Sequence, residues 1–238
     1  MVKRMSLSLR VALFTFAVGF LVVGVFDAFR FFSADYLRQT SLSLPYVGMA
    51  ASMLGFYLMF RARRGLDETY LRSALEGKQS ILAAVGIYLA TAISIAILGV
   101  RVGASNAPEI PLWAVVAVGA AVALSLGNFF LGLVLIVRDL IGKWTGAVAW
   151  FAFVWSLGVA VVTGVAVAEQ LPTLVHEFFA NPLFLVVSYI PLAFVMTPLF
   201  LTFLLLGAVY WVAERNVTRS SQIHRASTPW RRRFTTVQ

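Results

Sequence analysis

The sequence contains no cysteine, only two histidines and few charged residues. The missing cysteine excludes disulfides, thiol catalysis, iron–sulfur clusters and thioether attachment of haem. Histidine is the usual axial ligand of haem, and His176 and His224 both lie outside the long apolar runs, so we expect no haem and no other cofactor. Charged residues make up 12% of the 238 positions and hydrophobic residues 61%. So apolar a chain is not expected to fold as a soluble globule.

The charged residues fall in a few clusters, and long apolar runs separate them. A spanning helix needs about 20 mainly apolar residues. The sequence therefore predicts an all-α, polytopic integral membrane bundle, with one transmembrane domain over residues 1–213 and a basic cytoplasmic tail over 214–238. Six transmembrane helices are expected, at about residues 9–26, 43–60, 79–100, 111–137, 144–168 and 194–213.

The distribution of basic residues predicts the orientation of these helices. If the N-terminus is cytoplasmic, all but three of the 19 lysines and arginines lie inside, and only Arg30, Arg38 and Arg101 lie outside. This matches the positive-inside bias of membrane proteins. We therefore expect a multi-pass protein of the cell membrane with both termini in the cytoplasm and the tail near anionic lipid. Topology and lipid attraction account for the basic pI, so no nucleic-acid partner is expected.

The last apolar run, residues 182–213, is too long for one straight crossing. As a single helix it would measure about 48 Å, against a hydrocarbon core of about 30 Å. Pro191 and Pro198 lie inside it and favour kinks. Two interpretations remain: an outer re-entrant or interfacial hairpin around 170–190 followed by one crossing at 194–213, or one tilted and kinked helix.

Apart from Arg10 at the very start of the first range, none of the six predicted membrane cores contains an ionisable residue, which argues against proton relays, ion-coupled transport and voltage sensing. Catalytic motifs are incomplete as well. The stretch "HEFFA" at 176–180 lacks the second histidine of a zinc-protease helix, and neither Gly77-Lys78 nor Gly142-Lys143 completes a phosphate-binding loop. The sequence predicts no metal site, no catalytic residue and no enzyme activity.

Small and polar residues in the predicted cores indicate helix packing. Gly48, Ser52 and Gly55 form a flat ridge on the second predicted helix, where another helix backbone can approach closely. Asn128 is the most polar residue at depth, and we expect it to bond to a neighbouring helix rather than to a substrate. Tryptophans near predicted helix ends are read as interface anchors: Trp113, Trp144 and Trp211.

The charge-rich stretch between the second and third predicted helices is expected to form a short cytoplasmic amphipathic helix over residues 66–76. Gly65 and Gly77 bracket it, and Gly77 suits a left-handed C-terminal cap. Glu68 and Arg72 are spaced as an ion pair. Two interpretations remain, a connector that fixes topology and a docking element for a cytoplasmic partner. The docking residues would be Leu66, Glu68, Tyr70, Arg72 and Leu75.

Two stretches resemble ABC-2-type transporter permeases. "SADYLRQTSLSLPYVGMAASMLGFYLMFRARRGLDETYL" is similar to the family segment that runs from an outer aromatic loop through a proline-led second helix into a charged turn. "EQLPTLVHEFFANPLF" resembles the Leu-Pro…Asn-Pro-Leu stretch between the fifth and sixth helices. The resemblance implies a coupling helix at Leu66–Glu76 that touches an ATPase subunit, and an outer dip at Leu171–Leu183. The turn departs from the family's Glu-rich signature, since only Arg61, Arg63, Arg64 and Gly65 remain.

Two functions follow as expectations. The first is the membrane-spanning permease subunit of an ATP-driven transporter, in a homo- or hetero-oligomer with a separate P-loop ATPase subunit. The second is a non-catalytic structural or accessory membrane subunit of a larger complex, which explains the incomplete catalytic motifs with fewer assumptions.

Overall fold

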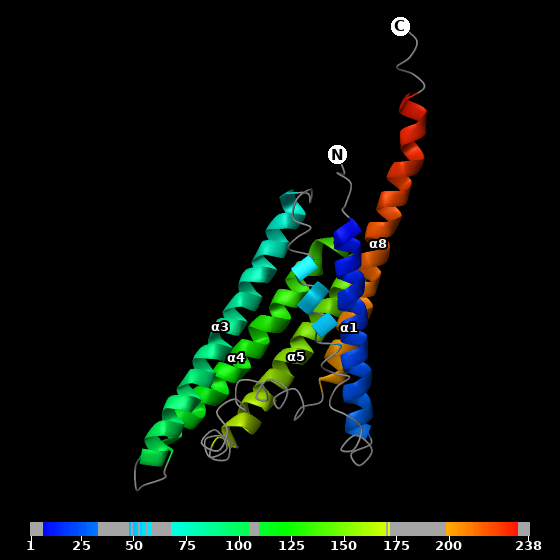
Figure 1. The fold of residues 1–238 in the computed structure, drawn as a ribbon. Helices are drawn as coiled ribbons and strands as arrows, with labels where there is room; N and C mark the ends of the chain where they lie inside the picture. The colour runs from blue at the N-terminus through cyan, green and yellow to red at the C-terminus, as the bar shows by residue number, and fades with distance from the viewer. Residues whose placement is uncertain are drawn as a thin grey trace. The chain divides into compact units, whose positions relative to one another are not determined.

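The computed structural model describes residues 7–32, 48, 50–51, 53–55, 57–58, 68–104, 110–169, 171 and 199–232. Over these residues every long element is an α-helix, and none is a strand (Figure 1). The helices are α1 (Leu7–Phe32), α3 (Glu68–Ala104), α4 (Leu112–Val137), α5 (Lys143–Glu169) and α8 (Phe200–Arg232). A short 3-10 turn, η1 (Arg138–Leu140), joins α4 to α5. The expected all-α class is therefore confirmed for this part of the chain.

Five of the described helices are long and apolar enough to cross a membrane. Their candidate spans are Leu9–Phe29, Ser73–Leu98, Leu112–Leu140, Lys143–Glu169 and Phe200–Arg219. Helices satisfy their own backbone hydrogen bonds, which is the requirement that a bilayer imposes on any spanning segment. Length and composition together identify a multi-pass integral membrane protein.

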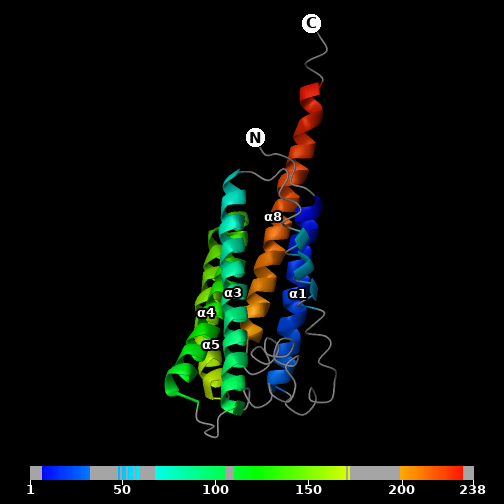
Figure 2. The ribbon, with the colours of Figure 1, turned by 60° about the vertical axis from the view of Figure 1, so that its left-hand side comes forward.

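The chain divides into two compact units. The first consists of Met1–Leu75, Ile136–Ala149 and Phe203–Gln238, and the second of Glu76–Leu135 and Trp150–Thr202. In the first unit α1 and α8 run antiparallel (Figure 2). Aromatic rings of the two helices meet along the seam. The ring centroids of Phe16 and Tyr210 lie 5.0 Å apart, and both side chains are buried. These rings form the core of the first unit.

A glycine on each helix lets α1 and α8 approach closely. A Cβ added at Gly207 would lie 2.7 Å from Leu21 Cγ, and one at Gly24 would lie 2.9 Å from the backbone nitrogen of Leu204. Side chains at these positions would push the helices apart. Small residues allow this kind of contact in membrane bundles, because helix association there depends on packing rather than on water exclusion.

The described helical residues between 48 and 58 pack beside α1. An added Cβ at Gly48 would lie 2.8 Å from the carbonyl oxygen of Gly19, and one at Gly55 would lie 3.0 Å from that of Ala12. The later residue, Gly55, contacts the earlier part of α1, so this segment and α1 run antiparallel. The residues expected to form a flat ridge thus lie against a helix backbone, while Ser52 lies outside the described residues.

In the second unit α3 packs against α4, and α4 packs against α5, each pair antiparallel (Figure 1). A Cβ added at Gly132 of α4 would lie 2.6 Å from the carbonyl oxygen of Gly77 on α3. One added at Gly119 of α4 would lie 2.8 Å from the carbonyl oxygen of Gly164 on α5. Glycine pairs therefore set both helix crossings.

The predicted separate helix over residues 66–76 is wrong in one respect. Residues 68–76 are helical, but α3 continues through Gly77 without a break to Ala104. Gly77 is buried inside the helix instead of capping its end. At this point α3 crosses α4 closely, since a Cβ added at Gly132 would lie 2.6 Å from the Gly77 carbonyl oxygen. The amphipathic segment is the N-terminal end of α3.

Two other helices extend past their predicted ends. Helix α1 reaches Phe32, which brings Asp27 inside a membrane-length span with only 9% of its surface exposed. The range expected for this crossing, 9–26, ends just before Asp27, so the acid lies in the part that α1 adds beyond it. Helix α8 continues from residue 213 to Arg232, so residues 214–232 are helical (Figure 2).

Several predicted features lie outside the described residues. Leu66, Pro191 and Pro198 are among them, as is nearly all of the hairpin expected around 170–190. Helix α8 begins at Phe200 rather than near residue 194. The starts and ends of α4 and α5 agree with the expected ranges to within a residue.

Candidate functional site: a polar cluster at one end of the first unit

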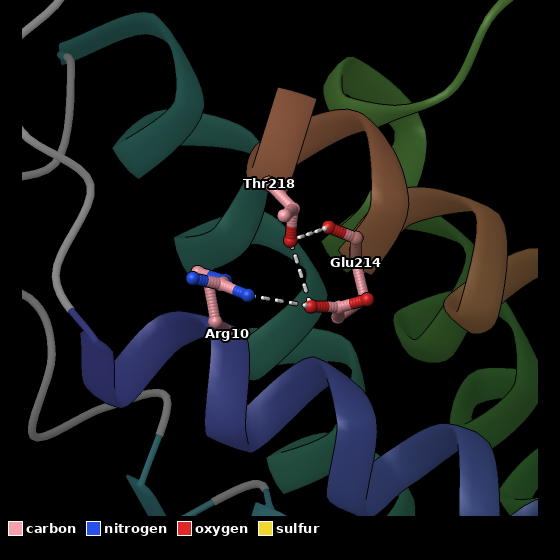
Figure 3. A network of polar contacts seen from close by, with 3 residues as sticks. All are labelled: Arg10, Glu214 and Thr218. Carbon is pink, nitrogen blue, oxygen red and sulfur yellow. Dashed lines mark hydrogen bonds and ion pairs between the residues drawn. The ribbon is translucent and has the colours of Figure 1, made fainter. Parts of the chain in front are cut away.

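Arg10 of α1 and Glu214 of α8 form an ion pair between the two helices of the first unit (Figure 3). Arg10 Nη2 lies 3.4 Å from Glu214 Oε1, and Thr218 Oγ1 donates to the same oxygen at 2.8 Å. Thr218 also donates to the Glu214 carbonyl at 3.0 Å, which fixes the threonine one turn above the carboxylate. The side chains of Arg10 and Glu214 are 36% and 20% exposed. A pair so accessible contributes about 1 kcal/mol or less.

The turn η1 is held from two sides. Ser73 Oγ, near the start of α3, donates a hydrogen bond of 2.6 Å to Asp139 Oδ2. Asn216 Nδ2 of α8 donates to the carbonyl oxygen of Leu140 at 3.1 Å. Arg138 Nε lies 3.5 Å from Asp139 Oδ1, so the carboxylate is bonded on both oxygens. The serine is buried, which makes this link the least hydrated of the three.

Together these links bring four charged stretches of the sequence to one end of the first unit. The stretches are the start of α1 up to Arg10, the start of α3, the α4–α5 turn and α8 from Glu214 onward. We name the side chains that make the links the polar cluster: Arg10, Ser73, Arg138, Asp139, Glu214, Asn216 and Thr218. Sequence analysis placed each stretch on the same side of the membrane but identified none of these partners. The available signal was the pair of opposite charges at the ends of the first and last apolar runs.

The predicted docking residues lie next to the polar cluster. Glu68, Tyr70 and Arg72 fall in the first two turns of α3, immediately before Ser73. Leu75 follows it and is half-buried. The first residues of α3 are therefore helical, and the Ser73–Asp139 hydrogen bond joins the helix just after them to the α4–α5 turn.

Asn128, the most polar residue predicted at depth, lies on the seam between α3 and α4. Its Nδ2 donates to the Leu124 carbonyl on its own helix at 2.9 Å. Ser80 Oγ of α3 donates to the Asn128 carbonyl at 2.7 Å, and Ser125 Oγ of α4 donates back to the Ala84 carbonyl at 2.8 Å. The seam is thus joined by hydrogen bonds in both directions, and these serines were not singled out from the sequence.

No group of three or more His, Cys, Asp or Glu side chains suited to a metal ion occurs within the described ranges. Among the described residues, the polar cluster holds one acid on each of two elements, Asp139 of η1 and Glu214 of α8, and each accepts a hydrogen bond from a side chain of another helix.

No family model, curated protein or solved structure matches the chain.

Proposed function

We propose that this protein is the membrane-spanning permease subunit of an ATP-driven transporter, and that a separate P-loop ATPase subunit docks at the polar cluster. The observation that carries the proposal is the joining of α1, α3, the α4–α5 turn and α8 at one end by the three interhelical links. A partner that binds there would act on several helices at once. The protein itself is non-catalytic in this proposal, and the energy comes from the partner.

The same links support six crossings with both termini on one side. The chain passes through α3 and α4 between Ser73 and Asp139, and these two residues are hydrogen-bonded to each other. It passes through α5 and α8 between Leu140 and Asn216, which are also hydrogen-bonded. Because each bonded pair lies on one side of the membrane, the chain between its members crosses the membrane an even number of times. Arg10 bonds to Glu214 and so lies on the same side as Asn216 and Ser73. The number of crossings between Arg10 and Ser73 is therefore even as well. Helix α1 is one of these, and the segment antiparallel to it around Gly48–Gly55 supplies the second.

The segment before α8 lies outside the described residues, so the choice between an outer dip and one kinked helix there stays a prediction. The positive-inside bias then assigns the end with the polar cluster to the cytoplasm of a cell membrane.

In this proposal the coupling element is the cytoplasmic end of α3, and Glu68, Tyr70, Arg72 and Leu75 meet the ATPase subunit. Because α3 is continuous, movement of its start would be transmitted along the helix to the Gly77–Gly132 crossing. The resemblance to ABC-2-type permeases supports the same assignment, and with it a homo-oligomer of this subunit or a hetero-oligomer with a second one.

The continuity of α3 also favours a second candidate, a non-catalytic accessory subunit of a larger membrane complex. A coupling helix of the kind that the resemblance implies is a separate element, whereas here no break separates residues 68–76 from the spanning part. A rigid helix that stands out from the span would serve equally well as an attachment point in a scaffold.

Co-purification from native membranes in mild detergent separates the two candidates. The permease proposal predicts a stoichiometric P-loop ATPase that is lost when Glu68→Arg and Arg72→Glu are combined. Arg101→Glu at the other end of α3 is the matched control and is expected to retain the partner. A stable assembly without any ATPase would support the accessory subunit and reject the permease.

A further inference from the structure

Three exposed side chains form a row along α8: Trp211, Arg215 and Arg219. They lie four positions apart, so they follow one stripe of the helix. The guanidinium carbon of Arg215 lies 5.8 Å from the centre of the Trp211 ring. This cation–π contact holds the arginine beside the indole. We call these three residues the α8 row.

Among the described residues, the acid next to Arg215 in the sequence is engaged elsewhere. Glu214 is turned toward α1, where it accepts from Arg10 and Thr218 (Figure 3). Asn216 is turned toward the α4–α5 turn, where it bonds to Leu140. Successive helical residues are about 100° apart, so Arg215 points about 100° from each of these two directions. Arg215 therefore points toward neither contact.

The depth of the row is set by its surroundings. Trp211 packs against Phe14 of α1, with ring centroids 5.8 Å apart, at the end of the apolar part of α8. Arg215 follows about 6 Å further along the axis, a little more than one turn, and Arg219 lies about the same distance beyond it. The candidate span ends at Arg219. The indole therefore lies at the edge of the apolar core, at the depth of the lipid glycerol. The two guanidinium groups lie further out, at the depth of the lipid phosphate.

We propose that the α8 row binds the headgroup of an anionic phospholipid. In this site the phosphodiester accepts hydrogen bonds from the Arg215 and Arg219 guanidinium groups, whose planar fork matches phosphate oxygens. Trp211 lies against the glycerol region and the first acyl carbons. Lys143 and Trp144, both exposed at the start of α5 beside the Leu140–Asn216 link, add positive charge and an interface anchor on one flank. The site is independent of the transport function proposed above.

The test uses the full-length protein in mild detergent, titrated with dioleoyl phosphatidylglycerol or dioleoyl phosphatidylcholine, with bound lipids counted by native mass spectrometry. Wild type is expected to bind phosphatidylglycerol more tightly than phosphatidylcholine. Arg215→Gln and Arg219→Gln are each expected to lower the phosphatidylglycerol affinity about fivefold, since a basic residue at the surface of an anionic membrane contributes about 1 kcal/mol. Arg215→Lys keeps the positive charge but not the planar guanidinium, and its phosphatidylglycerol affinity is expected to lie between those of wild type and Arg215→Gln.

Arg101→Gln is the matched control, because it removes one exposed arginine from the other end of a spanning helix. It is expected to leave the phosphatidylglycerol affinity within about twofold of wild type, a difference well below the effect of one surface arginine. Retained helicity of each variant is checked by circular dichroism. Equal phosphatidylglycerol affinity in Arg215→Gln and wild type overturns the proposal, as does an equal loss in Arg101→Gln. A row that binds a protein instead would leave lipid affinity unchanged in every variant, which also overturns it.

Discussion

Ser73 Oγ donates a hydrogen bond of 2.6 Å to Asp139 Oδ2, although two membrane-length helices lie between these residues in the sequence. The serine is 1% exposed, so its hydroxyl is withdrawn from water and depends on the carboxylate as an acceptor. A bond of this kind joins the start of α3 to the end of α4 more firmly than an exposed ion pair does. It is the firmest of the links on which the proposed docking end depends.

Ser73→Ala is expected to destabilise the protein by about 1–2 kcal/mol, because it leaves Asp139 without its buried donor. Thermal unfolding in detergent measures the effect. Ser94→Ala is the matched control, since Ser94 is exposed and its hydroxyl bonds only to the Ala90 carbonyl of its own helix. A loss in Ser94→Ala as large as in Ser73→Ala would contradict the role of the interhelical bond.

Exchange of the charges at Arg10 and Glu214 is expected to preserve their ion pair. Arg10→Glu and Glu214→Arg alone each place like charges together and are expected to lower stability by about 0.5–1 kcal/mol. The double variant should recover part of that loss. Raising the salt concentration should narrow the differences, because the pair is partly exposed. Single variants that are as stable as wild type at low salt would show that the pair contributes nothing.

Two kinds of glycine in the spanning helices are expected to respond oppositely to alanine. Gly132→Ala would bring a Cβ within 2.6 Å of the Gly77 carbonyl and is expected to cost about 1–3 kcal/mol, because the helices must separate. Gly158→Ala and Gly86→Ala meet open space and are expected to be neutral or to stabilise by up to about 1 kcal/mol, since alanine favours helix. Equal effects at all three positions in thermal unfolding would contradict the close α3–α4 crossing.

The limits of sequence interpretation are visible at individual residues. The ends of α4 and α5 are predictable because the apolar runs there stop at charged or turn-forming residues on both sides. The role of Gly77 is not predictable in this way. Its local pattern is that of a helix cap, whereas its place is decided by Gly132, a partner 55 positions away in the sequence.

The polar links are hidden for a similar reason. Ser80 and Ser125 donate to backbone carbonyls of the opposite helix, and a carbonyl leaves no residue-specific signal in a sequence. Ser73 and Asp139 do carry recognisable side chains, but their pairing depends on which helices are neighbours. The charge pattern predicts the side of the membrane for each stretch, and only the packed structure brings their partners together.

Single cysteines report the proposed topology directly, because the chain contains no cysteine of its own. Leu112 is 77% exposed at the start of α4, and Leu112→Cys is expected to react with an impermeant maleimide on intact cells. Leu7→Cys and Lys143→Cys are expected to react only after the membrane is permeabilised. Labelling of Lys143→Cys from outside would place the polar cluster on the wrong side for an ATPase.

The most direct test of the proposed permease function is a photo-crosslinking amino acid at Tyr70, in the first turn of α3, activated in native membranes. The proposal predicts one main protein adduct, and mass spectrometry should identify it as a P-loop ATPase subunit. The same probe at Trp113, at the start of α4, should give no such adduct. An adduct at Tyr70 with lipid alone, or with a protein that lacks a nucleotide-binding site, would contradict the assignment of this end as an ATPase docking surface.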